Sequence, residues 1–416
     1  MDHRRDGGLN LNFGQYAYEW REGINLERLR RERLEKTRAS MKKHGLDAIL
    51  LMDPCNIRYA TSTFTPRWMA TGIRYAIVLR DTNPILYEHG DISHRTRKEC
   101  PWLGKVKYSY PLFWAKSRPG ALADHIVKLW AEDVKKEFHD YGVDKGSIGL
   151  DIREFASVKG LKDVGIEVTD GQTPMLEARA TKTKDEISCL RMGAAICEAI
   201  FDALRRALRP GVRENELIAL MYQVGYSMGM DDMMPEIASG PNTWPNSKSS
   251  GTDRIIRPGD LVFYDIPASY NGYKTCYYRT FYVGRQPTPT QKDFYQQSLD
   301  WIRAAIQAIK PGATTADLAR CFPDAKELWG YESEWEGLAN QFGHGLGLAL
   351  HEPPTISRAF SFEYPYTLKE NMTLALETQQ GTEENGGVRI EEMLLVTSTG
   401  AEVLSKYPVD EIIAVP

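Results

Sequence analysis

DIPASYNGYKTCYYRTF (residues 265–281) is the most informative stretch of this 416-residue sequence. Two short runs rich in strand-forming residues flank Asn271-Gly272, a dipeptide typical of tight β-hairpin turns. The pattern therefore predicts a hairpin that brings Asp265 and Cys276 close together, and we expect these two side chains to share one site.

A new domain is predicted to begin near residue 180. Thr183 stands three residues before Glu186, which is a capping-box signature for the start of a helix, and the helical pattern ends at Pro210-Gly211. The length of the chain suggests about two domains. We therefore predict domains at residues 1–178 and 179–416.

The first domain alternates between helical and strand patterns. Helical spacing covers residues 26–45 and recurs near residues 121–140. Buried strands are predicted for the segments LDAILLM, RYAIVLR, PILYEH and SIGLD. This alternation predicts a small mixed domain with helices packed on a sheet.

The second domain contains a weak internal repeat. RPGVRENELIAL (209–220) resembles KPGATTADLARC (310–321), and each is a helix exit, a Pro-Gly turn and a new helix. Strand material follows in both cases, DLVFYDI in the first and MTLALE in the second. Two similar halves that face each other would form a cleft with carboxylates on both walls.

Only two of the eight histidines lie in the second domain, and both fall in GHGLGLALHEPP (343–354). The alternating glycines of this segment allow the backbone to pass close to other groups. The spacing is not that of a nucleotide-binding loop. His344 and His351 are thus the available neutral nitrogen ligands or bases of the domain.

Two predicted strands supply further carboxylates. MTLALETQQG (372–381) is expected to end a strand at Glu377, and GGVRIEEMLLVT (386–397) places Arg389 and Glu391 on one face of an apolar strand. A carboxylate in such a strand must be paired or bound to metal. Glu392, on the opposite face, is interpreted as an ordinary surface carboxylate.

Four stretches in this order resemble the pita-bread metallopeptidase family, which includes prolidase, aminopeptidase P, methionine aminopeptidase and creatinase. They are FYDIPASYNGYKTCYYRTF, FGHGLGLALHEPP, LALETQQG and GVRIEEMLLV. LDAILLMDPCNIRYATSTF (46–64) resembles the creatinase amino-terminal domain, and together with FGQYAYEW (13–20) it looks closest to the dimethylsulfoniopropionate lyase branch. The resemblance implies an α/β (α+β) chain, with a creatinase-like N-terminal domain followed by a pita-bread C-terminal domain.

The resemblance also implies a metal centre of one or two divalent ions, namely Zn, Mn or Fe. Its ligands would be Asp265, His344, Glu377 and Glu391, with Cys276 at the position of a second aspartate. A thiolate suits zinc or iron better than manganese. Two alternatives for Cys276 stay open: a small buried packing residue, or a nucleophile with His351 as its base.

Two further departures separate this chain from the branches that it resembles, one from the peptidases and one from the lyases. The loop at residues 238–260 has no histidine, whereas the peptidases carry one there. The lyase branch relies on an aspartate where this chain has Leu350-His351. By resemblance, His351 contacts the substrate and steadies the intermediate. A metal-free, creatinase-like site that binds a cationic substrate is the alternative to a metal centre.

A few residues are candidates for substrate recognition. In the family the first domain of one subunit often covers the site of its partner, so a homodimer is expected. Arg67, Trp68 and Trp244 are the candidate substrate contacts. Aromatic residues beside a cleft serve packing more often than recognition.

Composition excludes several classes of function. The net charge of −4, without a basic patch interleaved with aromatic residues, predicts no nucleic-acid partner. No apolar segment approaches the roughly 18 residues of a membrane span, and the six cysteines show no paired spacing. A cytoplasmic protein that does not bind membranes is therefore expected.

The predicted function is metal-assisted hydrolysis of a carbon–nitrogen bond in a small molecule, of the Xaa-Pro peptidase type or a related amide. The first alternative is a carbon–sulfur lyase that acts on dimethylsulfoniopropionate or a similar cation. The second is a catalytically inactive protein that binds a small molecule.

Overall fold

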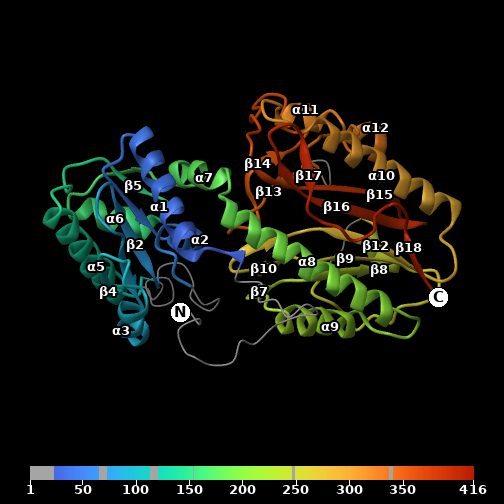
Figure 1. Ribbon diagram of the computed structural model, residues 1–416, viewed down its shortest axis with the longest axis horizontal. Helices are drawn as coiled ribbons and strands as arrows, with labels where there is room; N and C mark the ends of the chain where they lie inside the picture. The colour runs from blue at the N-terminus through green and yellow to red at the C-terminus, as the bar shows by residue number, and fades with distance from the viewer. Residues whose placement is uncertain (1–22, 65–72, 113–119, 153, 246–248, 337–340) are drawn as a thin grey trace. The chain divides into compact units, whose positions relative to one another are not determined.

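The computed structural model describes residues 23–64, 73–112, 120–152, 154–245, 249–336 and 341–416. The chain divides into two compact units, Met1–Arg179 (unit 1) and Ala180–Pro416 (unit 2). Both mix helices and strands (Figure 1). None of the described helices is long and apolar enough to cross a membrane.

Unit 1 is built on one mixed sheet with the strand order β4-β3-β2-β1-β5-β6. Its strands are β1 (Ala48–Leu51), β2 (Tyr75–Leu79), β3 (Ile85–Glu88), β4 (Lys105–Tyr108), β5 (Ile148–Leu150) and β6 (Val168–Asp170). Its helices are α1 (Leu26–Lys43), α2 (Pro54–Thr61), α3 (Gly90–Glu99), α5 (Ala121–Asp140), α6 (Phe155–Asp163) and α7 (Gln172–Ala180). The sequence pattern located α1, α5, β1, β2, β3 and β5 correctly.

One face of this sheet is covered by α5. Trp130 and Phe138 of the helix are fully buried in a cluster with Leu50, Ile77 and Tyr87 of the sheet. The apolar residues of α5 recur at helical spacing, so the sequence alone fixes which side of the helix is buried.

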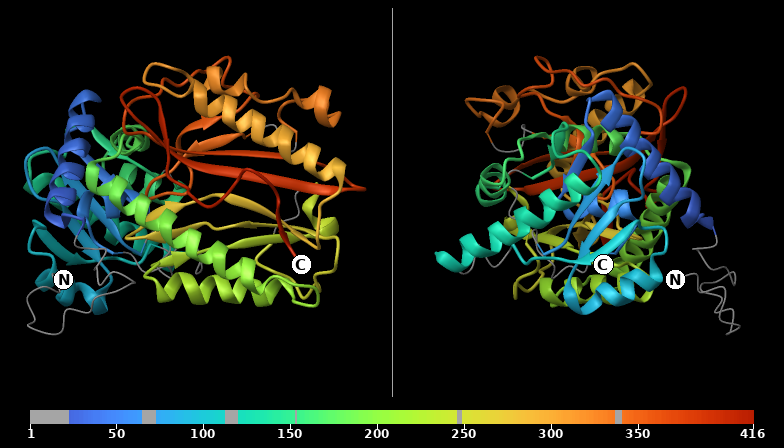
Figure 2. Two further views of the ribbon diagram at one scale, coloured as in Figure 1. Left: turned by 45° about the vertical axis from the view of Figure 1, so that its right-hand side comes forward. Right: turned by 90° about the vertical axis from the view of Figure 1, so that its left-hand side faces the viewer.

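Unit 2 places two sheets face to face between layers of helices (Figures 1 and 2). One sheet has the order β18-β12-β9-β8 and the other β14-β13-β15-β16-β17, and a short sheet, β11-β10-β7, adjoins the first. The strands are β7 (Asp232–Met233), β8 (Glu236–Ser239), β9 (Leu261–Asp265), β10 (Ala268–Tyr270), β11 (Tyr273–Thr275), β12 (Tyr278–Val283), β13 (Gly343–Gly345), β14 (Glu352–Ile356), β15 (Thr373–Thr382), β16 (Gly386–Val396), β17 (Ala401–Val403) and β18 (Ile413–Val415).

The helices of unit 2 shield the outer faces of the sheets. They are α8 (Lys184–Ala207), α9 (Glu214–Ser227), α10 (Pro289–Ala308), α11 (Thr315–Ala319) and α12 (Ala325–Trp329), with a 3-10 turn at Gly240–Thr243. α10 packs on β15 and β16, whereas α8 packs on β10 and β11. α10 and α8 thus lie on opposite outer sides of the two sheets (Figure 1).

The predicted capping box begins α8. Glu186 donates its backbone N–H to the Thr183 hydroxyl (3.4 Å), and the Glu186 carboxylate accepts the N–H of Thr183 (2.8 Å). These two bonds satisfy N–H groups that an uncapped helix would leave without a partner.

The internal repeat appears as two equivalent turns. Gly211 and Gly312 both have positive φ angles, of 94° and 90°. The N–H of each bonds to a carbonyl just before a strand, that of Ile256 and that of Leu368, at 2.9 Å in both cases. Asp265 and Glu377 each follow that carbonyl by nine residues, so the repeat puts one carboxylate on each sheet.

The hairpin predicted around Asn271-Gly272 is present. Both residues have positive φ angles, 50° and 83°, in a turn that joins β10 to β11. Positive φ at both central positions is the geometry of a type I′ turn, which matches the twist of the paired strands.

One strand boundary was predicted wrongly. The sequence pattern ended a strand at Glu377, but β15 continues to Thr382 and pairs with β16 over its whole length. Gln379 and Gln380 are polar yet almost fully buried. Two polar residues in a row suggested the end of the strand. The strand continues because its backbone pairs with β16 as far as Thr382.

The interpretation of Glu392 as a surface carboxylate was wrong, because this residue is buried and paired. It lies on the face of β16 opposite to Glu391 and forms an ion pair with the fully buried Arg279 at 3.0 Å. Arg279 also donates to the carbonyl of Glu391 (2.8 Å), so this pair ties β12 to β16. The Glu392 carboxylate also accepts a hydrogen bond from the Ser405 hydroxyl.

Changing Glu392 to Gln is expected to lower the free energy of unfolding of unit 2 by about 3–5 kcal/mol, because a buried guanidinium loses its counter-charge. The matched control is Glu402→Gln in the exposed Arg191–Glu402 pair, where a loss below about 1 kcal/mol is expected. Urea unfolding of both variants measures the difference. Equal losses would show that burial does not set the strength of these pairs.

Candidate metal centre

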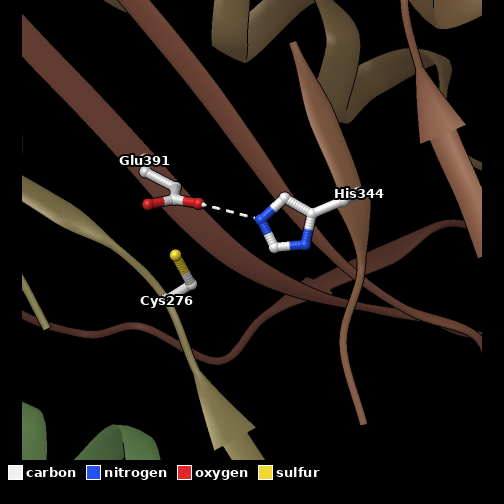
Figure 3. A group of neighbouring side chains, drawn as sticks. All are labelled: Cys276, His344 and Glu391. Carbon is white, nitrogen blue, oxygen red and sulfur yellow. Dashed lines mark ion pairs between the residues drawn. The ribbon is translucent and has the colours of Figure 1, made fainter. Parts of the chain in front are cut away.

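Three buried side chains, two from strands and one from the segment that follows a third strand, converge between the sheets of unit 2 (Figure 3). They are Cys276, which follows β11, His344 of β13 and Glu391 of β16. One sulfur, one nitrogen and one oxygen atom of this set lie within 4.8 Å of one another. We call these three residues the donor cluster.

A hydrogen bond to the backbone of the next residue sets the tautomer of His344. Its Nδ1 lies 3.0 Å from the Gly345 carbonyl and must carry the proton, because a carbonyl only accepts. Nε2 is then the nitrogen with a lone pair, and it lies 3.7 Å from Oε1 of Glu391. This is how a protein orients a metal-binding imidazole.

The alternating glycines make room for close packing around His344. A Cβ on Gly343 would lie 2.5 Å from the Ala375 carbonyl, and one on Gly345 would lie 2.4 Å from the Pro353 carbonyl. A Cβ on Gly347 would lie within 2.5 Å of the Glu352 carboxylate. Two of these glycines therefore let neighbouring strands approach closely, and the third leaves room for the Glu352 carboxylate.

Asp265 lies beside the donor cluster at the end of β9 and is almost fully buried. The thiol of Cys276 lies 3.5 Å from Oδ1 of Asp265. The hairpin thus brings these two residues together as predicted. In this arrangement the Cys276 thiol donates to the aspartate.

Glu377 of β15 lies directly opposite Glu391 of β16 in the register of these two strands. Its Oε2 accepts a bond from Arg389 at 2.7 Å, and its Oε1 accepts one from Gln341 at 2.9 Å. Both carboxylate oxygens therefore contact protein groups. Gln341 was missed by the sequence analysis, since an isolated glutamine before a glycine-rich segment carries no pattern.

Arg389 is the positive charge of the site. Its guanidinium lies 4.1 Å from the ring centre of Tyr278, next to Glu377. Burial opposes its charge, yet attraction to Tyr278 and to the carboxylates of Glu377, Asp265 and Glu391 raises the pKa of Arg389. Arg389 therefore offsets part of the negative charge around the cluster.

His351 stands at the open side of the cluster. Its side chain is exposed, and its ring centre lies 4.2 Å from that of His344. The Nε2 atom of His351 is 3.5 Å from the amide nitrogen of Gln341. His344 faces inward and His351 faces outward, so the two imidazoles are suited to different tasks.

Of the three candidate substrate contacts, the structure places Trp244. Its ring packs where β15 and β16 turn, because a Cβ on Gly381 or Gly387 would lie 2.8 or 3.1 Å from it. This contact packs the turn of the hairpin. Arg67 and Trp68 lie outside the described residues.

The donor cluster fits a divalent ion. Thiolate, imidazole and carboxylate are the donors that zinc and iron accept, and three protein ligands leave positions open for substrate or water. The three atoms would need only small shifts to reach a common ion.

Two family models match this chain. Residues 188–398 match metallopeptidase family M24, and residues 33–180 match the creatinase/prolidase N-terminal domain. The chain is 29% identical to an Xaa-Pro dipeptidase of Pyrococcus furiosus over 90% of this chain and 98% of the relative. It is 25% identical to a dimethylsulfoniopropionate lyase of Roseovarius nubinhibens over 97% of this chain and 92% of the relative.

The fold is shared with solved structures. An Xaa-Pro dipeptidase from Bacillus anthracis superposes with a TM-score of 0.74 at 24% identity, covering 94% of this chain and all of that one. The predicted order of a creatinase-like domain and a pita-bread domain is confirmed. A metallopeptidase family implies divalent metal ions as cofactors. The chain is an enzyme that belongs to metallopeptidase family M24.

Proposed function

We propose that the chain hydrolyses a carbon–nitrogen bond in a small peptide-like substrate of the Xaa-Pro type, at a centre that holds one divalent ion. The observation that carries this proposal is the donor cluster of Cys276, His344 and Glu391, buried within an M24 fold. The relative from Pyrococcus furiosus, an Xaa-Pro dipeptidase, supports the substrate class.

Zinc or iron is proposed, because the thiolate of Cys276 is a softer donor than the carboxylate of the family. The contacts of Glu377 with Arg389 and Gln341 support a single ion, since a second ion would have to displace them. The earlier prediction that Asp265 and Glu377 are also ligands remains a prediction.

When bound, the ion would polarise the substrate carbonyl and lower the pKa of a water molecule. The protein supplies the rest. The bond from Nδ1 of His344 to the Gly345 carbonyl directs Nε2 of the same ring toward Glu391. His351 is placed to donate a hydrogen bond to the oxygen on which negative charge develops. Hydrolysis then adds water across the carbon–nitrogen bond and releases an acid and an amine.

A carbon–sulfur lyase is the second candidate. The lyase of Roseovarius nubinhibens aligns with 97% of this chain, which includes much of the segment before residue 33. The site contains three carboxylates, those of Asp265, Glu377 and Glu391. Their negative charge would attract a sulfonium cation. In this case a base abstracts a proton and the carbon–sulfur bond breaks without water.

Two further proposals concern the state of the protein. We propose a homodimer, as the resemblance implies, and light scattering of the purified chain would test it. We also propose a cytoplasmic location. The six cysteines form no disulfide within the described residues, which suits a reducing compartment.

Elemental analysis of the purified protein is expected to find about one zinc or iron ion per chain, because three protein ligands suffice for a catalytic site. The same preparation is then assayed on a panel of Xaa-Pro dipeptides and on dimethylsulfoniopropionate. Release of proline supports the hydrolase, and release of a volatile thioether supports the lyase. A preparation with less than about a tenth of an ion per chain, active on neither class, would contradict the proposal.

A further inference from the structure

A buried ion pair lies directly behind the segment that carries His351. Nζ of Lys182 is 3.0 Å from Oε2 of Glu352, and both side chains are only 1% exposed. Lys182 also donates to the carbonyl of Ala180 at 3.3 Å, and its N–H bonds to the Asn371 carbonyl. Burial of two charges is costly, so a pair of this kind must hold a specific geometry to be retained.

The Glu352 carboxylate is surrounded by the segment that leads to His351. Its Oε1 accepts the N–H of Ala349 at 3.0 Å. Gly347 packs against the same carboxylate, where any side chain would collide with it. Residues 347–352 therefore fold around one negative charge, which Lys182 neutralises from the other side.

The ends of this segment are fixed independently. Leu346 exchanges hydrogen bonds with Thr373, and the Gly347 carbonyl accepts the N–H of Lys274 at 2.7 Å. Glu352 pairs with Gly345 where β13 meets β14. His351 is exposed between these anchors, and its backbone position follows from the turn that Glu352 closes.

We propose that Lys182 is a positioning residue: its ion pair with Glu352 fixes residues 346–352 and so holds the His351 ring beside His344. The proposal rests on the proposed function, because it takes His351 as the residue that contacts the substrate. It adds a second-domain lysine to the residues that set the rate of the reaction.

The test is the variant Lys182→Met, which keeps the length of the side chain and removes its charge. We expect kcat to fall roughly 10- to 100-fold, as a displacement of about 1 Å does at other sites. KM and the metal content are expected to change less than kcat. Hydrogen exchange measured by mass spectrometry is expected to accelerate in residues 346–352, where the amide of Ala349 depends on Glu352.

The double variant Lys182→Met with Glu352→Met separates positioning from stability. Removing both charges is expected to return the urea midpoint toward that of the wild type, because neither charge is left buried alone. Exchange is expected to stay fast and kcat low, since Ala349 has lost its acceptor. A double variant with wild-type stability and wild-type kcat would overturn the proposal. This variant also serves if Lys182→Met fails to fold.

Glu137→Gln is the matched control. Glu137 is a buried glutamate of unit 1 that pairs with Lys105 and Lys107 at 2.8 Å. Its loss is expected to destabilise unit 1 and to leave exchange in residues 346–352 and kcat unchanged. Hydrogen exchange can be measured without a substrate. If the wild type were inactive on every substrate, the proposed function would be refuted, but the exchange measurement would still test whether Lys182 fixes residues 346–352. Unchanged exchange in Lys182→Met would refute the inference alone.

Discussion

Cys276→Ala is expected to lose the bound ion and the activity together. The affinity for zinc should fall by more than the roughly 10- to 100-fold that removal of an outer-shell partner costs, because a direct donor is lost. Protein loaded with Co²⁺ is expected to show a thiolate-to-metal charge-transfer band in the wild type and none in the variant. Elemental analysis and absorption spectroscopy measure both effects without substrate.

Cys276→Asp is the informative counterpart. It restores the hard oxygen donor that the family resemblance implies at this position, so the preference is expected to shift from zinc or iron toward manganese. If charge alone limits occupancy, the number of ions per chain should also rise toward two. The charge-transfer band of the Co²⁺ protein should be absent.

Cys197→Ala is the control for these two variants. Cys197 is fully buried in the same unit, and burial raises its pKa to about 12, so its sulfur stays protonated. Its Sγ lies 3.3 Å from the Thr275 hydroxyl, close in sequence to Cys276. We expect its removal to leave the metal content unchanged. A Cys276→Ala protein that keeps its ion would show instead that Cys276 is a packing residue.

The parts of the site that were predictable from sequence depend on local patterns. Asn271-Gly272 specified the hairpin, and the hairpin is what brings Asp265 to Cys276. Strand alternation placed Glu391 and Glu392 on opposite faces, and the structure buries Glu391 toward the donor cluster and pairs Glu392 with Arg279. Such patterns act through neighbours within a few residues, so the sequence carries them directly.

The parts that were not predictable depend on contacts between distant residues. Gln341 meets Glu377 across 36 residues, and Lys182 meets Glu352 across 170. Neither contact leaves a periodic signal in the sequence. The extension of β15 beyond Glu377 has the same origin, because its partner strand stabilises two buried glutamines that look like loop residues. Polar residues buried by tertiary pairing are the general weakness of pattern-based prediction.

The two adjacent imidazoles should respond to mutation in opposite ways. His351→Ala is expected to lower kcat by about 10²–10³-fold, the usual effect of removing one donor to a developing oxyanion. The metal content should stay at the wild-type value, because His351 is exposed and lies outside the donor cluster. Steady-state kinetics with elemental analysis of the same preparation gives both quantities.

His344→Ala is the comparison that makes this result decisive. Its ring is buried, with Nδ1 bonded to the Gly345 carbonyl and Nε2 directed at Glu391. We expect this variant to lose the ion and therefore all activity. Because the ring centres are only 4.2 Å apart, a general disturbance of the segment would affect both properties in both variants. Metal loss in His351→Ala, or an unchanged kcat, would show that the outer imidazole has another role.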